Sequence, residues 1–410
     1  MAPHTSEAKK AAMSGGEDLI SALPDGVAGH IVGFLPVEQA VQTSVLARQW
    51  RHVWSSSMRR LRFVSSDGRL ESSYNFNKLV YHVLLRRDPS MALDEVEFTG
   101  TATRFWHENN IDLNAWIRHA LLCRTSLLCV RIPFKCFPRL DGSVALASRY
   151  LKRLEISHMF VDGNSGHFSS CPALEDVKMV HCHIRTDRIL SQSVKRFCIT
   201  DSYFCVAIQT RVSVPSATVL QLDYNSIQAP LLDSIPPLER AAVAPRSLLH
   251  FCHGEVNGEC CGICAKCQGT DDCTGGCLHL GGLASAANLE LIADCRTIIF
   301  RRDMRWCPTF SRLKTLLMNG WCVAANIDPL VCMLEHSPVL ENLTLLLGKG
   351  PIRSKDVEEK YGLLDRSPVI SDTLKKVVVK CEQRDERVLK IASFFITFDI
   401  KITIKVTPAE

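Results

Sequence analysis

A short pattern, apolar-x-x-apolar-x-apolar, recurs along most of this chain and constrains its fold more than any other feature. In the middle of the chain, successive copies begin 24, 23, 20, 23 and 21 residues apart. Each copy has one apolar face that it cannot bury alone, so neighbouring copies must stack into a continuous core. We therefore predict an α/β solenoid in which one short strand per copy lines a concave wall. The copies begin at Leu93, Leu127, Leu151, Leu174, Val194, Ala217, Leu238, Ala286, Leu313, Leu340 and Leu374.

The spacing also indicates the kind of repeat. A period of about 20 to 29 residues is typical of a leucine-rich repeat. The copies at Leu238 and Ala286 match the pattern least well. Residues 59–90 and 100–125 contain no copy of the pattern that we can assign. We expect them to be helical connecting material.

Composition excludes several broad classes. The 410 residues are 46% hydrophobic and 22% charged, which is unlike a disordered chain. No apolar run reaches the ~18 residues of a membrane-spanning helix. The net charge of +5 is too small to favour a nucleic-acid binder. Residues 1–16, which we expect to be a disordered tail, lack the apolar core of a secretory signal, so we expect reduced thiols in the nucleus or cytoplasm.

A helical pattern precedes the repeats, from Leu23 to Trp54. Pro24 suits a first helical turn, and Pro36 ends the first helix because the residue before proline avoids the α region. Two further apolar faces follow, so this stretch predicts three short helices. About 32 residues form too small a core to be stable alone, so the unit needs the rest of the chain or a partner.

The residues of this unit carry a family resemblance. Leu23-Pro24-Asp25, Phe34-Leu35-Pro36 and the stretch 40–54 (AVQTSVLARQWRHVW) closely resemble the F-box of plant F-box/leucine-rich-repeat proteins. In that family the F-box docks to the adaptor subunit of an SCF-type cullin–RING ubiquitin ligase. A plain helical cap on the next domain is the alternative interpretation. The resemblance places the following residues at or beneath the adaptor contact: Leu23, Pro24, Ile31, Leu35, Val45 and Trp50.

The first predicted helix departs from this pattern at three glycines. Each would cost roughly 1 kcal/mol relative to alanine in a helix interior. We therefore expect this helix to be ordered mainly by docking. The glycines are Gly26, Gly29 and Gly33.

The later part of the chain also resembles grass F-box/leucine-rich-repeat proteins. The stretch 313–347 and the segment LKKVVVKCEQRDERVLKIASFF carry the resemblance, and the latter is similar to a shortened FBD domain. We predict an F-box at 17–58, a repeat domain at 59–350 and a C-terminal repeat or FBD-like segment at 351–410.

A cysteine-rich insert interrupts the repeats at about residues 250–280, between the copies at Leu238 and Ala286. Tetrahedral zinc requires four soft ligands, and a C-x2-C pair supplies two thiolates from one tight turn. The candidate set is Cys261, Cys264, Cys273 and Cys277, with Cys264 and Cys267 as an alternative first pair. A loop without ligand, an iron–sulfur site and a disulfide or redox use remain open.

No catalytic motif accompanies these features. The sequence has no phosphate-binding G-x-x-x-x-G-K-[ST] loop, and the His107-Glu108 pair lacks the second histidine of H-E-x-x-H. The F-box resemblance implies a receptor subunit of a ubiquitin ligase, with the adaptor, the cullin and a target protein as partners, and the absence of these motifs leads us to expect that the subunit is non-catalytic. Two alternatives are a metal- or redox-sensing interaction protein and an F-box protein that acts outside a ligase.

Overall fold

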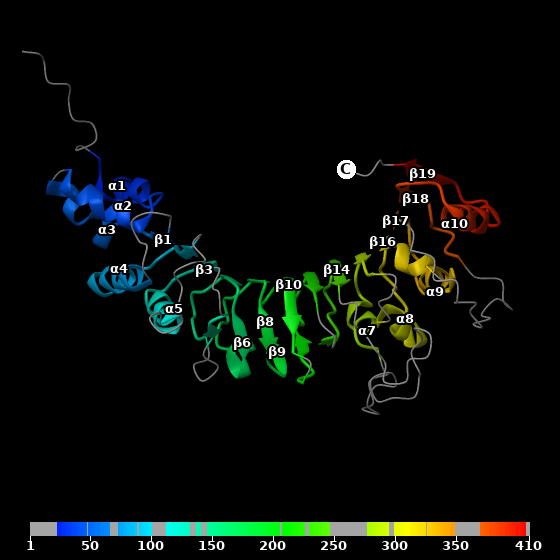
Figure 1. The fold of residues 1–410 in the computed structure, drawn as a ribbon, viewed down its shortest axis with the longest axis horizontal. Coiled ribbons are helices and arrows are strands. Elements are labelled where there is room, and N and C mark those ends of the chain that lie inside the picture. The colour runs from blue at the N-terminus through cyan, green and yellow to red at the C-terminus, as the bar shows by residue number, and fades with distance from the viewer. Residues whose placement is uncertain are drawn as a thin grey trace, which may run out of the picture.

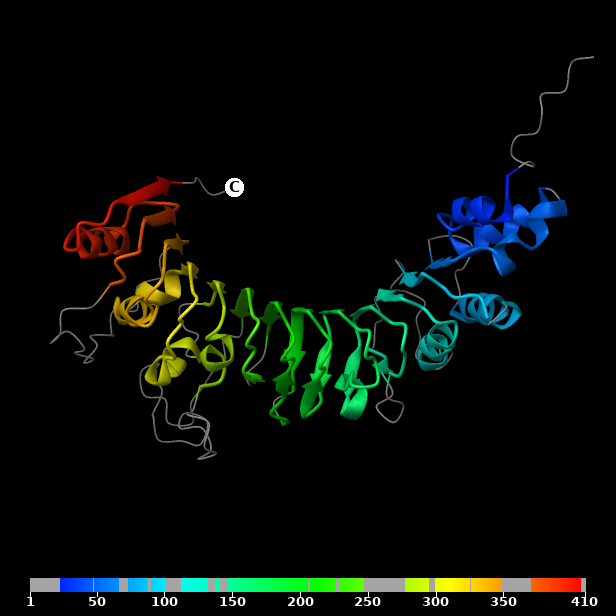
Figure 2. The same ribbon diagram turned by 180° about the vertical axis from the view of Figure 1, so that it is seen from behind.

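The computed structural model shows an arc of stacked strands and helices (Figures 1 and 2). The long strands form its inner side, and most helices lie on its outer side. The N-terminal helices and the last strand, β19, stand at opposite ends of the arc. The structure describes residues 23–46, 48–65, 73–87, 90–100, 112–131, 137–140, 146–205, 207–225, 229–246, 277–294, 299–324, 326–348 and 370–406.

The inner side is a sheet of parallel strands that follow one another in chain order, apart from short strands on the outer side. This mixed α/β arrangement with one large parallel sheet is consistent with a leucine-rich-repeat solenoid. Its strands are β1 (Arg60–Ser65), β2 (Glu95–Gly100), β3 (Leu127–Arg131), β5 (Arg153–Ser157), β7 (Asp176–Val180), β10 (Arg196–Phe204), β12 (Val219–Tyr224), β14 (Arg240–Pro245), β15 (Asn288–Leu291), β16 (Thr315–Asn319), β17 (Asn342–Leu347), β18 (Lys376–Cys381) and β19 (Ile402–Val406).

The outer side changes character along the arc. Helices cover its two ends, and short strands cover its middle (Figure 1). The strands are β4 (Arg139–Leu140), β6 (Phe160–Asp162), β8 (His183–Arg185), β9 (Arg188–Leu190), β11 (Arg211–Ser213) and β13 (Leu231–Leu232), with the short helix η4 (Gly163–Gly166). The helices are α4 (Ser73–Arg86), α5 (Leu113–Leu122), α7 (Leu280–Leu283), α8 (Ile299–Asp303), η5 (Met304–Trp306), η6 (Gly320–Val323), α9 (Asp328–Glu335) and α10 (Glu386–Ile396).

The apolar pattern of each copy forms the core. In the copy at Leu151, for example, Leu151, Leu154 and Ile156 are almost fully buried. The side chains between them point to the opposite, concave face because successive residues of a strand alternate. The two weakest sequence matches also contain strands, and β14 pairs directly with β15 on either side of the cysteine-rich insert.

One repeat differs in register from the sequence prediction. The copy predicted at Leu127 really begins at Thr125, because Val96 of β2 pairs with Leu128 and Phe98 pairs with Val130. Thr125 occupies the first core position and is fully buried, and its hydroxyl donates to the Ala120 carbonyl. Because Thr125 is polar at a position that is apolar in the other copies, the sequence pattern did not reveal the register of this copy.

Residues 59–90, expected to be helical connecting material, begin with a strand. The stretch from Met58 through Leu61 to Phe63 follows the same apolar pattern, and β1 pairs in parallel with β2. Helices α4 and α5 lie in the expected helical stretches.

Strands β5, β7 and β10 bend at one repeated position. His158, His181 and Asp201 have positive φ angles of 57°, 51° and 46°. Ser157 and Val180, which directly precede His158 and His181, pair with each other. The two histidines therefore occupy equivalent positions in neighbouring repeats. A left-handed residue there turns the chain from the concave wall toward the outer side.

The N-terminal unit joins the start of the sheet. It comprises α1 (Asp25–Val32), α2 (Val37–Gln42), η1 (Thr43–Val45), η2 (Arg48–Arg51) and α3 (Val53–Ser56). Arg62 of β1 donates to the Phe34 carbonyl at 3.0 Å, and the Arg60 guanidinium lies 5.3 Å from the Phe34 ring centroid. None of the helices in the described part of the chain combines the length and apolar character needed to span a membrane.

Candidate docking surfaces

The N-terminal unit leaves apolar side chains in solvent. Val45 is 85% exposed and Leu46 is 74% exposed, while Ile31 and Phe34 of the first helical segment are about half exposed. Val32 and Val53 of the same unit are buried in the core. Several large apolar side chains left exposed in one small unit commonly mark a protein-binding site.

The six residues assigned to an adaptor contact differ in burial. Because no partner is present, their assignment stays a prediction. Pro24, Ile31 and Val45 are exposed, Leu23 and Leu35 are half-buried, and Trp50 is buried.

Phe34 and Leu46 are exposed apolar residues that the sequence analysis did not assign. Leu46 follows Val45 directly, and two adjacent residues on a helical turn point about 100° apart. A narrow buried face cannot hold both side chains. The adjacency of Val45 and Leu46 in the sequence was therefore the signal that at least one of the two side chains is exposed.

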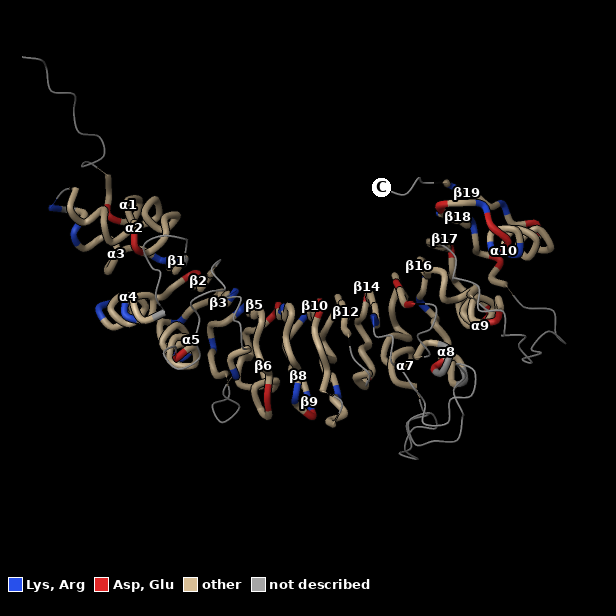
Figure 3. The backbone as a smooth tube through the Cα atoms, in the orientation of Figure 1, with Lys and Arg blue, Asp and Glu red and all other residues tan. Residues whose placement is uncertain are grey.

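Basic and acidic residues recur along the strands from β1 to β7 (Figure 3), and their side chains form a ladder of ion pairs on the concave wall. Arg62 Nε donates to Glu97 at 2.9 Å. Arg131 bridges two strands, donating to Glu97 at 3.1 Å and to Glu155 at 2.9 Å and 3.0 Å. Lys178 Nζ lies 3.5 Å from Glu155. The charges of this half of the wall therefore largely satisfy one another.

The electrostatics at Glu155 follow from this arrangement. Burial alone would raise the pKa of Glu155, but the hydrogen bonds and charges of Arg131 and Lys178 outweigh burial and hold the pKa below its ordinary value. The hydrogen bond with Glu155 is also the main reason that the pKa of Arg131 is raised. Glu155 is therefore ionised, although only 5% of its surface is exposed.

The wall from β14 to β17 is less charged. Its concave positions include Ala242, Ala244, Ile292, Leu317 and Leu346, which are all partly exposed. A hollow of about 500 Å³ lies against β12, β14 and β15. Its lining includes Gln221, Asp223, Ala242, Arg246, Glu290 and Ile292.

The predicted zinc ligands are mostly outside the described residues. Cys261, Cys264 and Cys273, together with the alternative ligand Cys267, belong to the stretch 247–276. Cys277 is described and is half-buried beside α7. The sequence analysis missed a second group of potential ligands, Cys307, Cys332 and His336, whose ligand atoms lie close together.

Comparison with known proteins gives relatives of one kind, although no protein-family model matches the chain. The MEIOTIC F-BOX protein MOF of rice is 26% identical over 392 residues, which cover 88% of this chain and 80% of the relative. An F-box/LRR-repeat protein of Arabidopsis thaliana is 24% identical over 387 residues, covering 84% of this chain and 75% of the relative.

A putative F-box/FBD/LRR-repeat protein of Arabidopsis thaliana is 28% identical over 260 residues, covering 56% of this chain and 61% of the relative. These names match both the N-terminal resemblance and the repeat pattern. The homologues of this chain are therefore plant F-box/LRR and F-box/FBD/LRR proteins, related to it at modest identity over most of its length.

Proposed function

We propose that the chain is the substrate-recognition subunit of an SCF-type cullin–RING ubiquitin ligase. The exposed apolar face of the N-terminal unit carries this proposal. Residues 17–58 form the F-box and bind the adaptor, and through it the cullin. The repeats at 59–350 hold the target protein. The F-box names of the homologues support this assignment.

The energetic case for docking rests on the exposed residues. Fully burying one Val, Leu, Ile or Phe side chain contributes about 1.5–3 kcal/mol. Val45 and Leu46 are mostly exposed, and Ile31 and Phe34 about half, so a partner that covers them gains a large part of that free energy. The buried residues beneath, including Trp50, fix the shape of this face.

We place target binding on the less charged half of the concave wall, from β14 to β17. The ladder around Glu155 is already paired within the chain, so a partner there would have to displace those ion pairs. Ala244, Ile292 and Leu317 instead offer small and apolar surface beside the hollow. We therefore assign the target contact to β14–β17.

The chain contributes no chemistry to ubiquitin transfer in this proposal. It tethers the target near a ubiquitin-loaded partner enzyme and thereby raises the effective concentration of the target. The site of action is the nucleus, the cytoplasm or both.

Co-purification from plant cells treated with a proteasome inhibitor tests the proposal. The full-length chain should recover adaptor, cullin and ubiquitinated targets. Leu23→Ala combined with Pro24→Ala, and separately Ile31→Asp, should abolish recovery of adaptor and cullin. Leu389→Asp is a matched control, because Leu389 is a 65% exposed leucine on α10 at the other end of the arc.

The target surface has its own variant. Ile292→Arg with Leu317→Arg should keep adaptor and cullin but lose the targets. Recovery of adaptor and cullin without any ubiquitinated target in the wild type would point to an F-box protein that acts outside a ligase. Unchanged recovery with both N-terminal variants would refute the docking assignment.

A further inference from the structure

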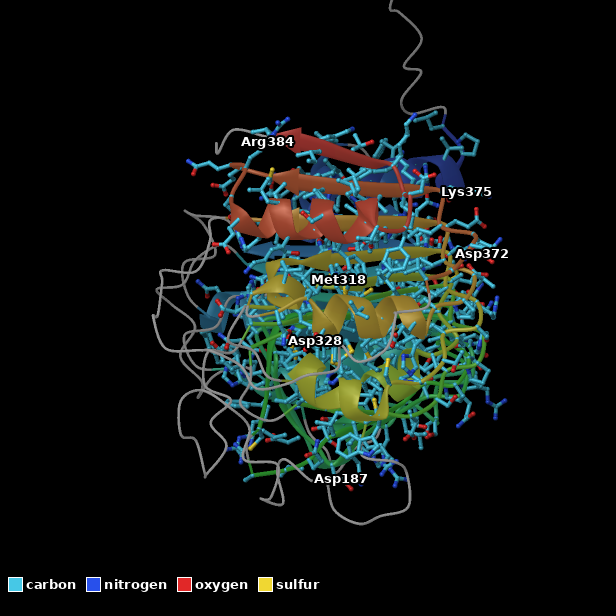
Figure 4. All side chains as sticks on the ribbon, turned by 90° about the vertical axis from the view of Figure 1, so that its right-hand side faces the viewer. Asp187, Met318, Asp328, Asp372, Lys375 and Arg384 are labelled. Carbon is cyan, nitrogen blue, oxygen red and sulfur yellow. The ribbon has the colours of Figure 1, made fainter. Side chains whose placement is uncertain are left out.

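Three potential metal ligands meet on the outer side of the solenoid. The sulfur atoms of Cys307 and Cys332 and one ring nitrogen of His336 all lie within 4.8 Å of one another. All three residues are half-buried. Figure 4 looks onto this flank, with Asp328 at the start of α9 labelled.

The spacing of these atoms fits a tetrahedral cation. Zinc binds sulfur at ~2.3 Å and imidazole nitrogen at ~2.0–2.1 Å, which places tetrahedral sulfur and nitrogen ligands ~3.6 Å apart. The Cys332 sulfur and His336 Nδ1 are 3.8 Å apart. A cation between them therefore requires only small side-chain adjustments.

Local structure holds the three ligands in place. Cys332 and His336 are four residues apart at the end of α9, so they share one helix face. Cys307 directly follows η5, and the Cys332 thiol lies 3.9 Å from the Met304 carbonyl of that helix. His336 Nδ1 lies 2.9 Å from the Cys332 carbonyl. Zinc would take the Nδ1 lone pair in the tautomer that carries its proton on Nε2, so metal binding would replace this contact with the carbonyl.

A further thiol, Cys277, lies on the segment that leads into α7, outside this group of three. Fully buried Asp303 accepts the backbone N–H groups of Leu278, His279 and Leu280 at 2.9, 2.7 and 3.1 Å, and so fixes the segment after Cys277. The Gly281 N–H donates to the Cys277 sulfur at 3.0 Å. Burial and the Asp303 carboxylate outweigh this donor and raise the pKa of the Cys277 thiol, so we do not count Cys277 among the ligands.

Two thiols and an imidazole thus converge from segments that are separated in the sequence. We propose that Cys307, Cys332 and His336 bind one Zn²⁺ ion, with a solvent molecule as the fourth ligand. Thiolate and imidazole ligands suit zinc. The ion would join α9 to the segment after η5. This set shares no residue with the zinc ligands predicted from the sequence.

Metal analysis of the full-length chain, purified in reducing buffer without chelator, tests the site. We expect about one zinc ion per chain. Cys307→Ser combined with Cys332→Ser should lose that zinc. Cys205→Ser is the matched control, since Cys205 is another half-buried thiol, and it should keep the zinc. A variant of the sequence-predicted loop set, Cys261→Ser with Cys264→Ser and Cys273→Ser, should also keep it.

Cobalt substitution provides a second measurement on the wild type, in case the double variant does not fold. Co²⁺ should give the absorption of a tetrahedral site with thiolate-to-metal charge transfer, and His336→Ala should change that spectrum. Zinc retained by the double variant would overturn the proposal, as would a wild type without metal. A Cys307–Cys332 disulfide, detected by mass after alkylation without reduction, would also overturn it.

Discussion

Gly29 on α1 passes so close to Ser57, at the end of α3, that an added Cβ would lie 2.6 Å from the Ser57 carbonyl carbon and oxygen. A glycine that disfavours the helix is therefore required by the packing of the N-terminal unit. Gly33 lies after the last residue of α1, so it does not weaken the helix interior.

Gly29→Ala should therefore destabilise the N-terminal unit. Overpacking of this kind costs about 1–3 kcal/mol. Gly26→Ala is the matched control, because nothing lies within 4 Å of an added Cβ there and alanine should stabilise the helix by up to ~1 kcal/mol. Urea unfolding followed by tryptophan fluorescence measures both changes. Equal effects of the two substitutions would show that the close approach is not real.

The register of β3 predicts different roles for two adjacent leucines. Leu128 is fully buried, whereas Leu127 is partly exposed on the concave side. Leu128→Ala should lower the free energy of unfolding by about 2–4 kcal/mol because it leaves a cavity. Leu127→Ala should cost less than ~1 kcal/mol. A larger loss of stability for Leu127→Ala than for Leu128→Ala would instead support the register predicted from the sequence.

Glu155 should anchor the ion-pair ladder. Glu155→Gln leaves Arg131 and Lys178 without their shared carboxylate and should cost about 1–3 kcal/mol. Glu175→Gln serves as the control, because Glu175 pairs with Lys195 in solvent, and it should cause no measurable change. Chemical denaturation at pH 7 compares the two variants.

The same residue predicts a pH dependence. The pKa of Glu155 lies below its ordinary value of 4.5 in the folded chain, so the unfolded chain binds this proton more tightly. Its contribution to stability is full above the unfolded pKa and is lost as the pH falls through the folded pKa. Stability of the wild type should therefore fall more steeply with acidification below pH 4.5 than that of Glu155→Gln. Parallel curves would contradict the pairing.

Core cysteines should resist alkylation in the folded chain. Burial is the main cause that raises the pKa of Cys182 to about 11 and that of Cys129 to about 12. Mass spectrometry after iodoacetamide treatment at about pH 8 should find both unlabelled, while half-buried Cys205 reacts. Urea should abolish the difference. Rapid labelling of Cys182 in folded protein would mean that its repeat opens.

The sequence predicted most of the sheet because leucine and valine recur at the core positions of nearly every copy. It missed β1 because Met58, Leu61 and Phe63 are separated by arginines and directly follow the N-terminal helical unit. It could not predict the group of Cys307, Cys332 and His336. Cys332 and His336 lie four residues apart at the end of α9, but Cys307 lies on another segment that meets them only in the folded chain, so no complete ligand motif is visible in the sequence.

The most direct measurement of the central claim is the Kd of the purified full-length chain for the purified SCF adaptor. We expect specific binding by the wild type, and Val45→Asp should weaken it at least about tenfold, or ~1.4 kcal/mol. Leu389→Asp at the far end of the arc should leave the Kd unchanged. A Val45→Asp variant that folds and binds like the wild type would contradict the account.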